Sequence, residues 1–317
     1  MRNPLGIDSS DAIHSIESID AVDVHVEGSG TEALLMVHGW PDTHRLWDSQ
    51  VEHLQDRYRC IRFTLPGFDG GCMPAPGRFA PAPRGHRRGP FVAHGEQPSW
   101  GGPAKVAQPR RAHSLAELVA TLRQVVQRTC PGQRVTLLLH DWGCVFGYEF
   151  AMRHPELVQR IVGVDIGDAG SRAHREALPA RAKLMVFAYQ AWLALAWVIG
   201  GHVSARLGDR MTRWMARVLR CRSDPGLIGW HMNYPYFIQW SGAHGSYRRA
   251  LRFEPSCPML YLWGRKKPFQ FHSARWVEAL RAKPGCQALE FDTGHWLMTA
   301  RPQAFNEAVA AWLAATA

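Results

Sequence analysis

Apolar runs alternate with amphipathic segments along most of the chain, and this alternation predicts strands and helices in turn. Continuous apolar runs are typical of buried strands, and apolar residues at helical spacing are typical of helices. Strands are expected at 33–37, 59–64, 134–140, 160–165, 258–263 and 287–291, and helices at 43–56, 114–130, 142–154, 272–282 and 303–313. Such alternation indicates an α/β fold, with a mainly parallel sheet and helices on both faces.

Residues 169–250 interrupt this alternation with helical patterns only, at 173–199, 203–219 and 225–240. A helical block between two strands is expected to form a cap over the carboxyl ends of the strands, where open α/β sheets bind ligands. The expected domains are therefore a core, 1–168 with 251–317, and a helical cap, 169–250. Residues 184–199 are apolar apart from Gln190, but sixteen residues are fewer than the roughly 20 that cross a bilayer. We expect a buried helix there, and contact with a membrane interface is the less favoured alternative.

Charge and composition set residues 72–112 apart from the rest of the core. This stretch holds seven Lys and Arg against one Glu, which is +6 of the chain's net +10, and eight of its 21 prolines. It follows neither a helical nor a strand period, so it is expected to be a flexible insertion. Its arginines are scattered among prolines with few aromatic residues, and we expect no nucleic-acid binding.

The overall composition is that of a globular protein. Apolar residues make up 46% and charged residues 20% of the 317 residues. The seven cysteines are irregularly spaced, which predicts reduced thiols rather than disulfides or a metal site. The first 20 residues contain no apolar signal segment, so a cytoplasmic location is expected. No cofactor is expected, and the oligomeric state stays open.

The apolar strand that ends near residue 139 runs into His140-Asp141-Trp142-Gly143 and then directly into a helix. A strand, a sharp turn and a helix present the turn residue at the top of a sheet, as for the nucleophile of a serine hydrolase. Here that residue is Asp141, whose carboxylate has an unperturbed pKa of about 3.9 and is ionised at neutral pH. It can displace a leaving group from a tetrahedral carbon and form an ester. The alternative is a helix N-cap.

Hydrolysis of such an ester needs a base that activates water. His295 lies in the turn Asp292-Thr293-Gly294-His295-Trp296, just after the last expected strand. An oxyanion also needs two backbone N–H groups, and Trp142 and Trp40 are expected to supply them.

The motifs His38-Gly39-Trp40-Pro41, His140-Asp141-Trp142-Gly143 and Gly294-His295 together resemble the α/β-hydrolase superfamily, and within it the epoxide hydrolase and haloalkane dehalogenase branch. The resemblance covers nearly the whole chain outside 72–112. It implies an α/β-hydrolase fold, with Asp141 as nucleophile, His295 as base and Trp40 and Trp142 as oxyanion donors. His38 and Phe237 are expected beside them at the substrate. One departure is Leu139, where the family's turn usually has a small residue.

The acid that orients the histidine departs from the common family position. In many members it follows the strand that corresponds to 258–263, but here that position is Lys267, and no Asp or Glu occurs before Glu278. The family's other placement is the end of the preceding core strand. Asp165 stands there and is the expected third member, with Asp168 as the alternative.

The leaving group separates the two branches. A halide needs N–H donors, whereas an epoxide oxygen leaves as an alkoxide that must be protonated by a phenol. The helical block offers Tyr189, Tyr234, Tyr236 and Tyr247, of which Tyr234 and Tyr236 are the expected donors. Trp40 stands where dehalogenases with this acid position usually carry Asn. We therefore expect a hydrolase that opens a small apolar epoxide to a vicinal diol. The alternatives are a haloalkane or haloacid dehalogenase acting on a halogenated substrate, and a non-catalytic lidded binding protein.

Overall fold

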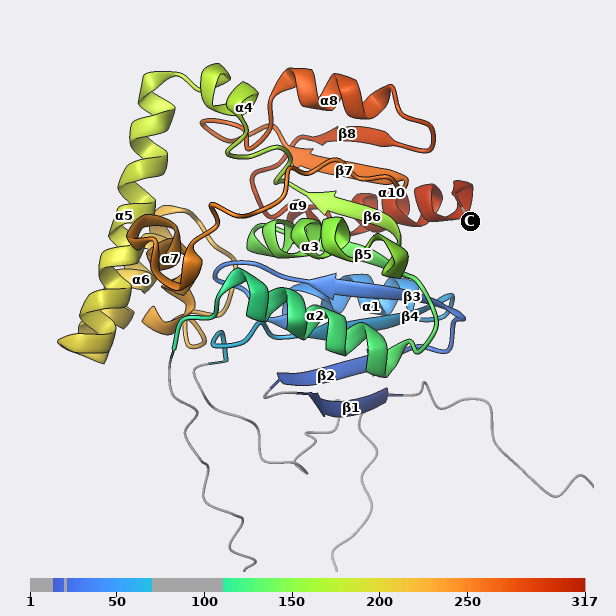
Figure 1. Cartoon of the computed structure of the whole chain (residues 1–317), viewed down its shortest axis with the longest axis horizontal. Coiled ribbons are helices and arrows are strands. Elements are labelled where there is room, and N and C mark those ends of the chain that lie inside the picture. The colour runs from blue at the N-terminus through green and yellow to red at the C-terminus, as the bar shows by residue number, and fades with distance from the viewer. Residues whose placement is uncertain (1–13, 20–21, 70–110, 317) are drawn as a thin grey trace, which may run out of the picture.

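A computed structural model of the protein describes residues 14–19, 22–69 and 111–316 (Figure 1). The insertion expected at 72–112 lies outside these residues, apart from its last two positions.

One mixed sheet forms the centre of the described structure. Its strands stand in the order β1-β2-β4-β3-β5-β6-β7-β8, and every neighbouring pair from β4 to β8 is parallel. The two strands at the other edge, β1 and β2, are antiparallel. The mainly parallel sheet expected from the sequence is confirmed. The strands are β1 (His14–Ile19), β2 (Val22–Glu27), β3 (Glu32–Val37), β4 (Tyr58–Phe63), β5 (Val135–His140), β6 (Val158–Val164), β7 (Met259–Gly264) and β8 (Gln287–Phe291).

Helices cover both faces of this sheet. Alternate residues of β3 point to opposite faces: Leu35 packs in one apolar cluster with α2, α3 and α8, and Leu34 packs in a second cluster with α1 and α10. Because both faces are covered, the central strands are buried along their whole length, as the continuous apolar runs predict. These helices are α1 (Asp48–Leu54), α2 (Leu115–Thr129), α3 (Trp142–Arg153), α8 (Ala274–Arg281), α9 (Leu297–Ala300) and α10 (Pro302–Ala315).

The remaining helices lie within residues 169–250, called the helical segment below. They are α4 (Arg172–Ala177), α5 (Ala180–His202), α6 (Ala205–Val218) and α7 (Tyr234–Ser241), with the short 3₁₀ turn η3 (Trp230–Asn233) before α7. Figure 1 shows α5, α6 and α7 beside the ends of the sheet toward which the arrows of β6 and β7 point. The segment therefore adjoins the carboxyl ends of the parallel strands. Three further 3₁₀ turns are η1 (His44–Trp47), η2 (Pro155–Leu157) and η4 (Ala243–Gly245).

The helical segment differs from its expected pattern at two points. Pro179 divides the helix expected at 173–199, because proline is tolerated at a helix start but not in its interior, and α5 then continues to His202. The helix expected at 225–240 begins only at Trp230, after irregular backbone. At the chain's start, the hairpin of β1 and β2 was not predicted, because β2 alternates with polar residues and is buried at only two positions.

Candidate active site

The turn between β5 and α3 carries Asp141. Its backbone has φ 53° and ψ −124°, a conformation that side chains other than glycine rarely adopt and that the surrounding packing must maintain. The helix α3 begins at the next residue, so the positive end of its dipole lies at the Asp141 carboxylate. This is the strand–turn–helix arrangement that the sequence predicts at this position.

Leu139 does not crowd this turn, because the facing helix makes room for it. Its side chain is fully buried and packs against Gly147 of α3. A Cβ atom at residue 147 would lie 2.5 Å from both terminal carbons of Leu139. The large side chain of Leu139 on β5 therefore fits because residue 147 of α3 is a glycine.

We expect the Gly147→Ala substitution to destabilise the fold by about 1–3 kcal/mol, because the added methyl overpacks the Leu139 site. In the Leu139→Ala background the same substitution should cost at least about 1 kcal/mol less, since the two sites are in contact. Urea unfolding of the four proteins measures this coupling. As a control, Gly201→Ala in α5, where a new Cβ would come no closer than 3.5 Å to another atom, should not destabilise. Equal costs of Gly147→Ala in both backgrounds would contradict the pairing.

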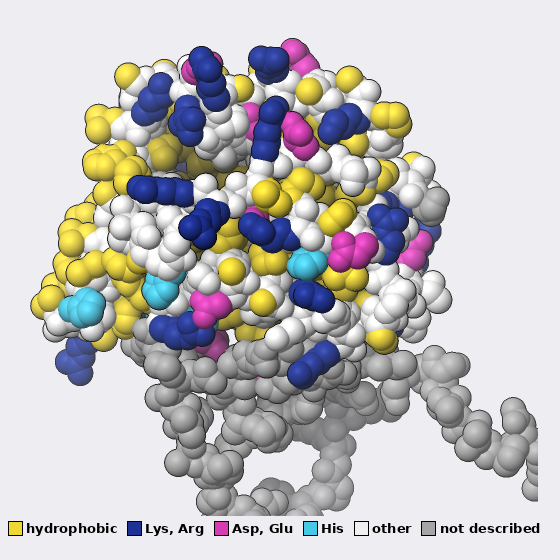
Figure 2. Space-filling model, in the orientation of Figure 1, with side chains coloured by type: hydrophobic (Ala, Val, Ile, Leu, Met, Phe, Trp, Pro, Cys, Tyr) yellow, Lys and Arg dark blue, Asp and Glu magenta, His cyan; other side chains and the backbone are white. Residues whose placement is uncertain are grey.

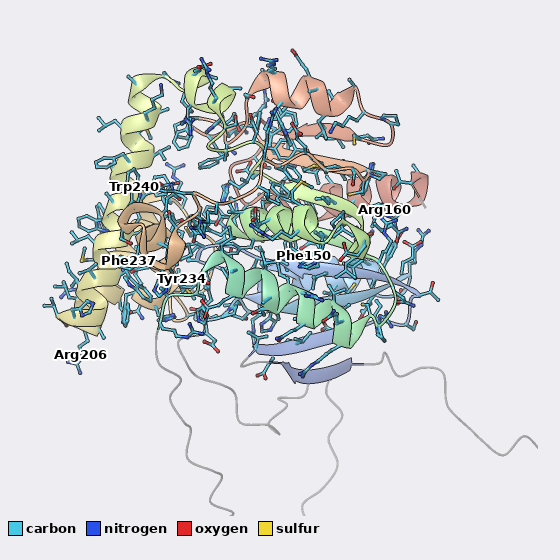
Figure 3. All side chains as sticks on the ribbon, in the orientation of Figure 1. Phe150, Arg160, Arg206, Tyr234, Phe237 and Trp240 are labelled. Atoms are coloured by element: carbon cyan, nitrogen blue, oxygen red, sulfur yellow. The ribbon has the colours of Figure 1, made fainter. Side chains whose placement is uncertain are left out.

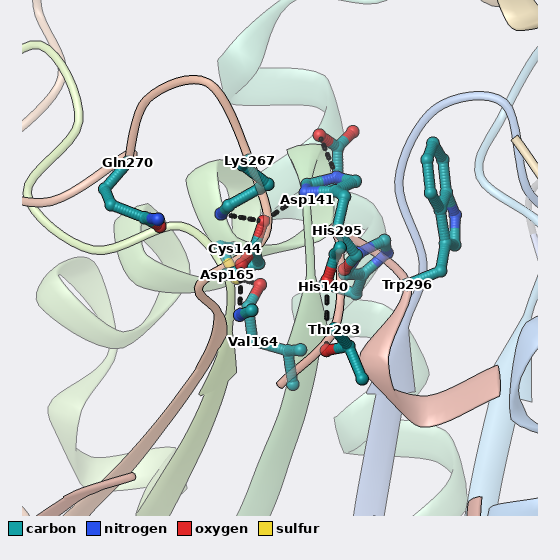
Figure 4. A network of polar contacts seen from close by, with 12 residues as sticks. His140, Asp141, Cys144, Val164, Asp165, Lys267, Gln270, Thr293, His295 and Trp296 are labelled. Atoms are coloured by element: carbon teal, nitrogen blue, oxygen red, sulfur yellow. Dashed lines mark hydrogen bonds and ion pairs between the residues drawn. The ribbon is translucent and has the colours of Figure 1, made fainter. Parts of the chain in front are cut away.

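His295 lies between Asp141 and Asp165, in the loop that joins β8 to α9 (Figure 4). Its Nε2 is 3.2 Å from Asp141 Oδ2, and its Nδ1 hydrogen-bonds Asp165 Oδ2. The loop is held from beneath, where His140 Nε2 donates to the His295 carbonyl oxygen at 3.2 Å. The structure therefore aligns the three expected residues in one hydrogen-bonded row.

Asp165 is the first residue after β6, and its own φ is also positive, at 69°. Its carboxylate is completely buried. Besides the His295 contact at Oδ2, its Oδ1 accepts a hydrogen bond from the backbone N–H of Gly264 at 3.0 Å. Asp168, the alternative acid, instead accepts hydrogen bonds from Ser171 and Ser273 and anchors the start of α8. Only Asp165 of this pair reaches the histidine.

Lys267 is a component of the site that the sequence did not assign. Its Nζ lies 2.5 Å from Asp165 Oδ2, and its side chain is only 7% exposed. The lysine at the family's usual acid position thus forms a buried ion pair with the acid that replaces it. Burial raises the pKa of Asp165, but the charge of Lys267, followed by His295, outweighs this effect and lowers it. Asp165 is therefore held as a carboxylate.

Two carboxylates determine the charge of His295. Burial alone would lower the pKa of the imidazole, but Asp165, followed by Asp141, outweighs it and raises the pKa to about 9. Burial also raises the pKa of Asp141, but the His295 hydrogen bond more than compensates and lowers it. At neutral pH the free site therefore holds an imidazolium between two carboxylates.

Backbone N–H groups hold the second oxygen of Asp141. The Trp40 N–H donates to Asp141 Oδ1 at 2.8 Å, and the Trp142 N–H also hydrogen-bonds this carboxylate. The loop approaches so closely because residue 39 is glycine: a Cβ there would lie 2.5 Å from Asp141 Oδ1. The side chain of Trp40 points elsewhere, and its indole N–H donates to Asn233 Oδ1 at 2.8 Å. Both expected oxyanion donors thus contact the carboxylate through their backbone.

Of the two tyrosines expected as proton donors, only Tyr236 faces Asp141. Its ring packs edge-on against Trp40 and Trp142 at centroid distances of 5.8 and 5.3 Å. Burial, followed by the Asp141 charge, raises the pKa of Tyr236 well above its usual value. Tyr234 lies elsewhere: its ring packs against Phe68 and His113, and its hydroxyl has no hydrogen-bond partner among the described residues.

Tyr189 of α5 packs against Tyr236. Its ring centroid lies 6.1 Å from that of Tyr236, and burial, with the Asp141 charge adding to it, raises its pKa. Gln190 donates to the Tyr189 oxygen at 3.1 Å and accepts from Gln239. A glutamine inside an otherwise apolar helix was the available sequence signal for this site.

Two residues expected at the substrate lie elsewhere. His38 is completely buried and fixes a loop: its Nε2 accepts from the Leu65 N–H at 2.9 Å, and its Nδ1 donates to the Gly39 carbonyl oxygen. Phe237 points into the helical segment, where it stacks on Trp197 (Figure 3). Within residues 14–19, 22–69 and 111–316, no cluster of three His, Cys, Asp or Glu residues could hold a metal ion.

Comparisons with known proteins agree with this architecture. A family described as alpha/beta hydrolase fold matches residues 32–300. Epoxide hydrolase 2 of Caenorhabditis elegans is 27% identical over 131 residues, which are 41% of this chain and 27% of that protein. The cis-3-alkyl-4-alkyloxetan-2-one decarboxylase of Xanthomonas campestris pv. campestris is 30% identical over 134 residues, 42% of this chain and 36% of that protein.

Among solved structures, a mutant epoxide hydrolase from Bacillus megaterium complexed with its product superposes with a TM-score of 0.62. It is 18% identical, and the superposition covers 94% of this chain and 99% of that one, so it shows a shared fold. The matches to curated relatives cover between 22% and 38% of those relatives' own length.

Proposed function

The chain belongs to the α/β-hydrolase family, and we propose that it opens small apolar epoxides to vicinal diols through an ester on Asp141. The proposal rests on the alignment of Asp141, His295 and Asp165 and on the two phenols beside them. Both steps of the reaction use only water and groups of the chain.

In the first step Asp141 Oδ2 attacks one epoxide carbon, and the ring carbon–oxygen bond at that carbon breaks. Oδ1 is held by the Trp40 N–H, which leaves Oδ2 as the attacking atom. The epoxide oxygen takes a proton from the hydroxyl of Tyr189 or Tyr236 as it leaves. Their raised pKa values keep both phenols protonated at neutral pH, as a proton donor requires.

In the second step water attacks the Cγ of the Asp141 ester while His295 Nε2 removes its proton. The oxyanion forms at Oδ1, on the N–H groups of Trp40 and Trp142. The Cγ–Oδ2 bond then breaks as the His295 imidazolium returns its proton to the departing oxygen, and the diol is released. Formation of the ester removes the negative charge of Asp141, which is one of the causes that raise the pKa of His295. The imidazolium then gives up its Nε2 proton to solvent, and the tyrosinate left by the first step takes one up from solvent. The neutral imidazole is the base of the second step.

One observation favours an epoxide over a halide as the reacting group. The Trp40 indole N–H is already donated to Asn233 Oδ1, so it is not free to bind a halide. The Tyr189 oxygen, in contrast, accepts from Gln190, which leaves its O–H free to donate to a substrate. A phenol O–H can protonate the alkoxide that an epoxide releases, so this site suits an epoxide better than a halide.

Intact-mass spectrometry of a His295→Gln variant tests this function. The variant should form the Asp141 ester and fail to hydrolyse it, because the base of the second step is missing. Incubated with styrene oxide, its mass should rise by the full mass of the epoxide, since ring opening expels no atoms. The matched control is His295→Gln with Asp141→Asn, which should show no increase.

Two further substrates separate the alternatives. A bromoalkane that adds its mass minus hydrogen bromide, with no adduct from the epoxide, would contradict the proposal in favour of dehalogenation. A dialkyl oxetan-2-one that is turned over while epoxides are not would assign the chemistry named for the Xanthomonas relative. Absence of adduct and of wild-type turnover in every arm would support a binding protein instead.

A further inference from the structure

The outer surface of the helical segment combines exposed apolar side chains with a strong positive charge. Thirteen large apolar residues are exposed in the described part of the chain, and eleven of them lie between residues 184 and 240. Figure 2 shows apolar side chains gathered along the left-hand edge of the molecule, where Figure 1 has α5 and α6. An apolar surface of this extent needs an occupant.

The expectation that residues 184–199 form a buried helix was wrong for one side of α5, because its exposed apolar residues form one stripe there. Leu184, Phe187, Leu195 and Val198 recur at helical spacing, and their exposed fractions run from 37% to 66%. The opposite side of the same helix is buried and carries Gln190 and, next to it, Tyr189 toward the active site.

On α6 an apolar stripe runs beside an arginine stripe. Leu207, Trp214 and Val218 are between 43% and 55% exposed. Arg206, Arg210, Arg213 and Arg217 follow the same helical period along one border of this stripe, and Figure 3 shows Arg206 pointing outward at the end of α6. Ring contacts join the helices into one surface, at 4.9 Å between Trp192 and Trp214 and at 5.1 Å between Phe187 and Trp240 of α7.

The net charge of this segment identifies the kind of occupant. Residues 169–250 contain twelve Lys and Arg but three Asp and Glu, a charge of +9 in a chain of +10. No Asp or Glu occurs from residue 177 to residue 208. A second copy of the chain would bring another +9 against this face and be repelled. An anionic bilayer offers negative headgroups to the arginines and an apolar layer to the stripes, with exposed Trp at the boundary.

We propose that the outer face of α5 and α6 docks this protein on an anionic membrane surface. The helices lie in the plane of the interface rather than crossing it. By length and apolar composition α5 could span a bilayer, alone among the described helices. Its inner side, however, packs on α6 and α7 and holds Tyr189 and Gln190, and spanning would strip these contacts from it. An amphipathic helix with arginines and aromatic residues is suited to the interface. The docking does not depend on the proposed chemistry.

Vesicle flotation of the full chain tests this docking without any substrate. We expect at least tenfold tighter binding to phosphatidylcholine vesicles containing phosphatidylglycerol than to phosphatidylcholine alone, with weaker binding in 0.5 M NaCl. Leu184→Ser with Leu195→Ser, and separately Arg206→Gln with Arg217→Gln, should each reduce binding at least fivefold. These side chains are exposed, so circular dichroism and Tm should stay unchanged.

The matched controls lie on the core. Leu289→Ser replaces an exposed leucine that lies outside the helical segment. Arg123→Gln with Arg128→Gln removes two positive charges from α2, as many as the arginine variant removes from α6. Equal losses of binding in these controls would overturn the proposal, because the binding would then not be localised to α5 and α6. Full binding by the Leu184→Ser with Leu195→Ser variant would also overturn it, because charge alone would then explain the binding. A dimer in analytical ultracentrifugation that dissociates in the leucine variant, with no vesicle binding, would assign the face to a second copy instead.

Discussion

The Asp165→Asn variant is expected to lose about 10²–10⁴-fold in kcat for epoxide hydrolysis while keeping its fold. The neutral amide no longer stabilises the imidazolium or fixes the tautomer in which Nδ1 donates to residue 165. The carboxylate is a main cause of the raised pKa of His295, so this pKa should fall from about 9. Steady-state kinetics and an NMR titration of His295 measure the two effects together.

Two control variants separate catalysis from stability. Asp165→Asn leaves the Lys267 ammonium buried without its carboxylate, so Asp165→Asn with Lys267→Met removes this stability cost and should show the same loss of kcat. Asp168→Asn alters hydrogen bonds to Ser171 and Ser273 only and should retain most activity. Full activity in the double variant, or a greater loss in Asp168→Asn, would exclude Asp165 as the orienting acid.

The second large effect is expected from the phenols. Replacing both Tyr189 and Tyr236 by Phe should slow epoxide opening by about 10²–10⁴-fold, the range that a positioned proton donor contributes. Each single substitution should cost less, because the other hydroxyl still lies beside the Asp141 carboxylate. The rate of ester formation in a single turnover, measured by rapid-quench mass spectrometry, reports this step alone.

Tyr234→Phe is the matched control for the phenol experiment. Its hydroxyl is buried without a partner in the described structure, so its removal should leave the rate unchanged and not lower Tm. If Tyr234→Phe slowed ester formation as much as Tyr236→Phe, the donor assignment would be wrong. If a bromoalkane reacted normally in the Tyr189→Phe with Tyr236→Phe variant, the result would agree with a role in alkoxide protonation only.

The fold was largely predictable because its strands are buried on both faces. Continuous apolar runs such as 135–139 have no other low-energy place than the centre of a parallel sheet, and the helices between them have one apolar side. The β1–β2 hairpin could not be predicted in the same way. Only two of the six positions of β2 are buried, so its apolar pattern is weak, and its pairing is determined by tertiary contacts with β4.

The residues that the structure aligns with the turn at Asp141 were predictable where they follow strands. Asp165 directly follows β6 and His295 lies in the loop after β8, and parallel strands bring their carboxyl ends to one edge of the sheet. Tyr189 and Lys267 were not assigned, because a helix register and a buried ion pair become visible only once the elements are packed. Tyr234 and Tyr236 are two positions apart, and a helix directs such neighbours to different sides, so the sequence could not choose between them.

Asp141 and Asp165 follow the two strands of a single β5–α3–β6 unit and are 24 residues apart, whereas His295 lies 130 residues beyond Asp165. The two strands of this unit are adjacent and parallel, so its contacts are local along the chain and its two carboxylates belong to one cooperative piece. The imidazole is instead carried by the loop after β8, the outermost strand of the sheet. Local opening at that edge removes the base and leaves the carboxylate pair assembled. For the proposed function, we expect activity to be lost by this route before the fold is lost.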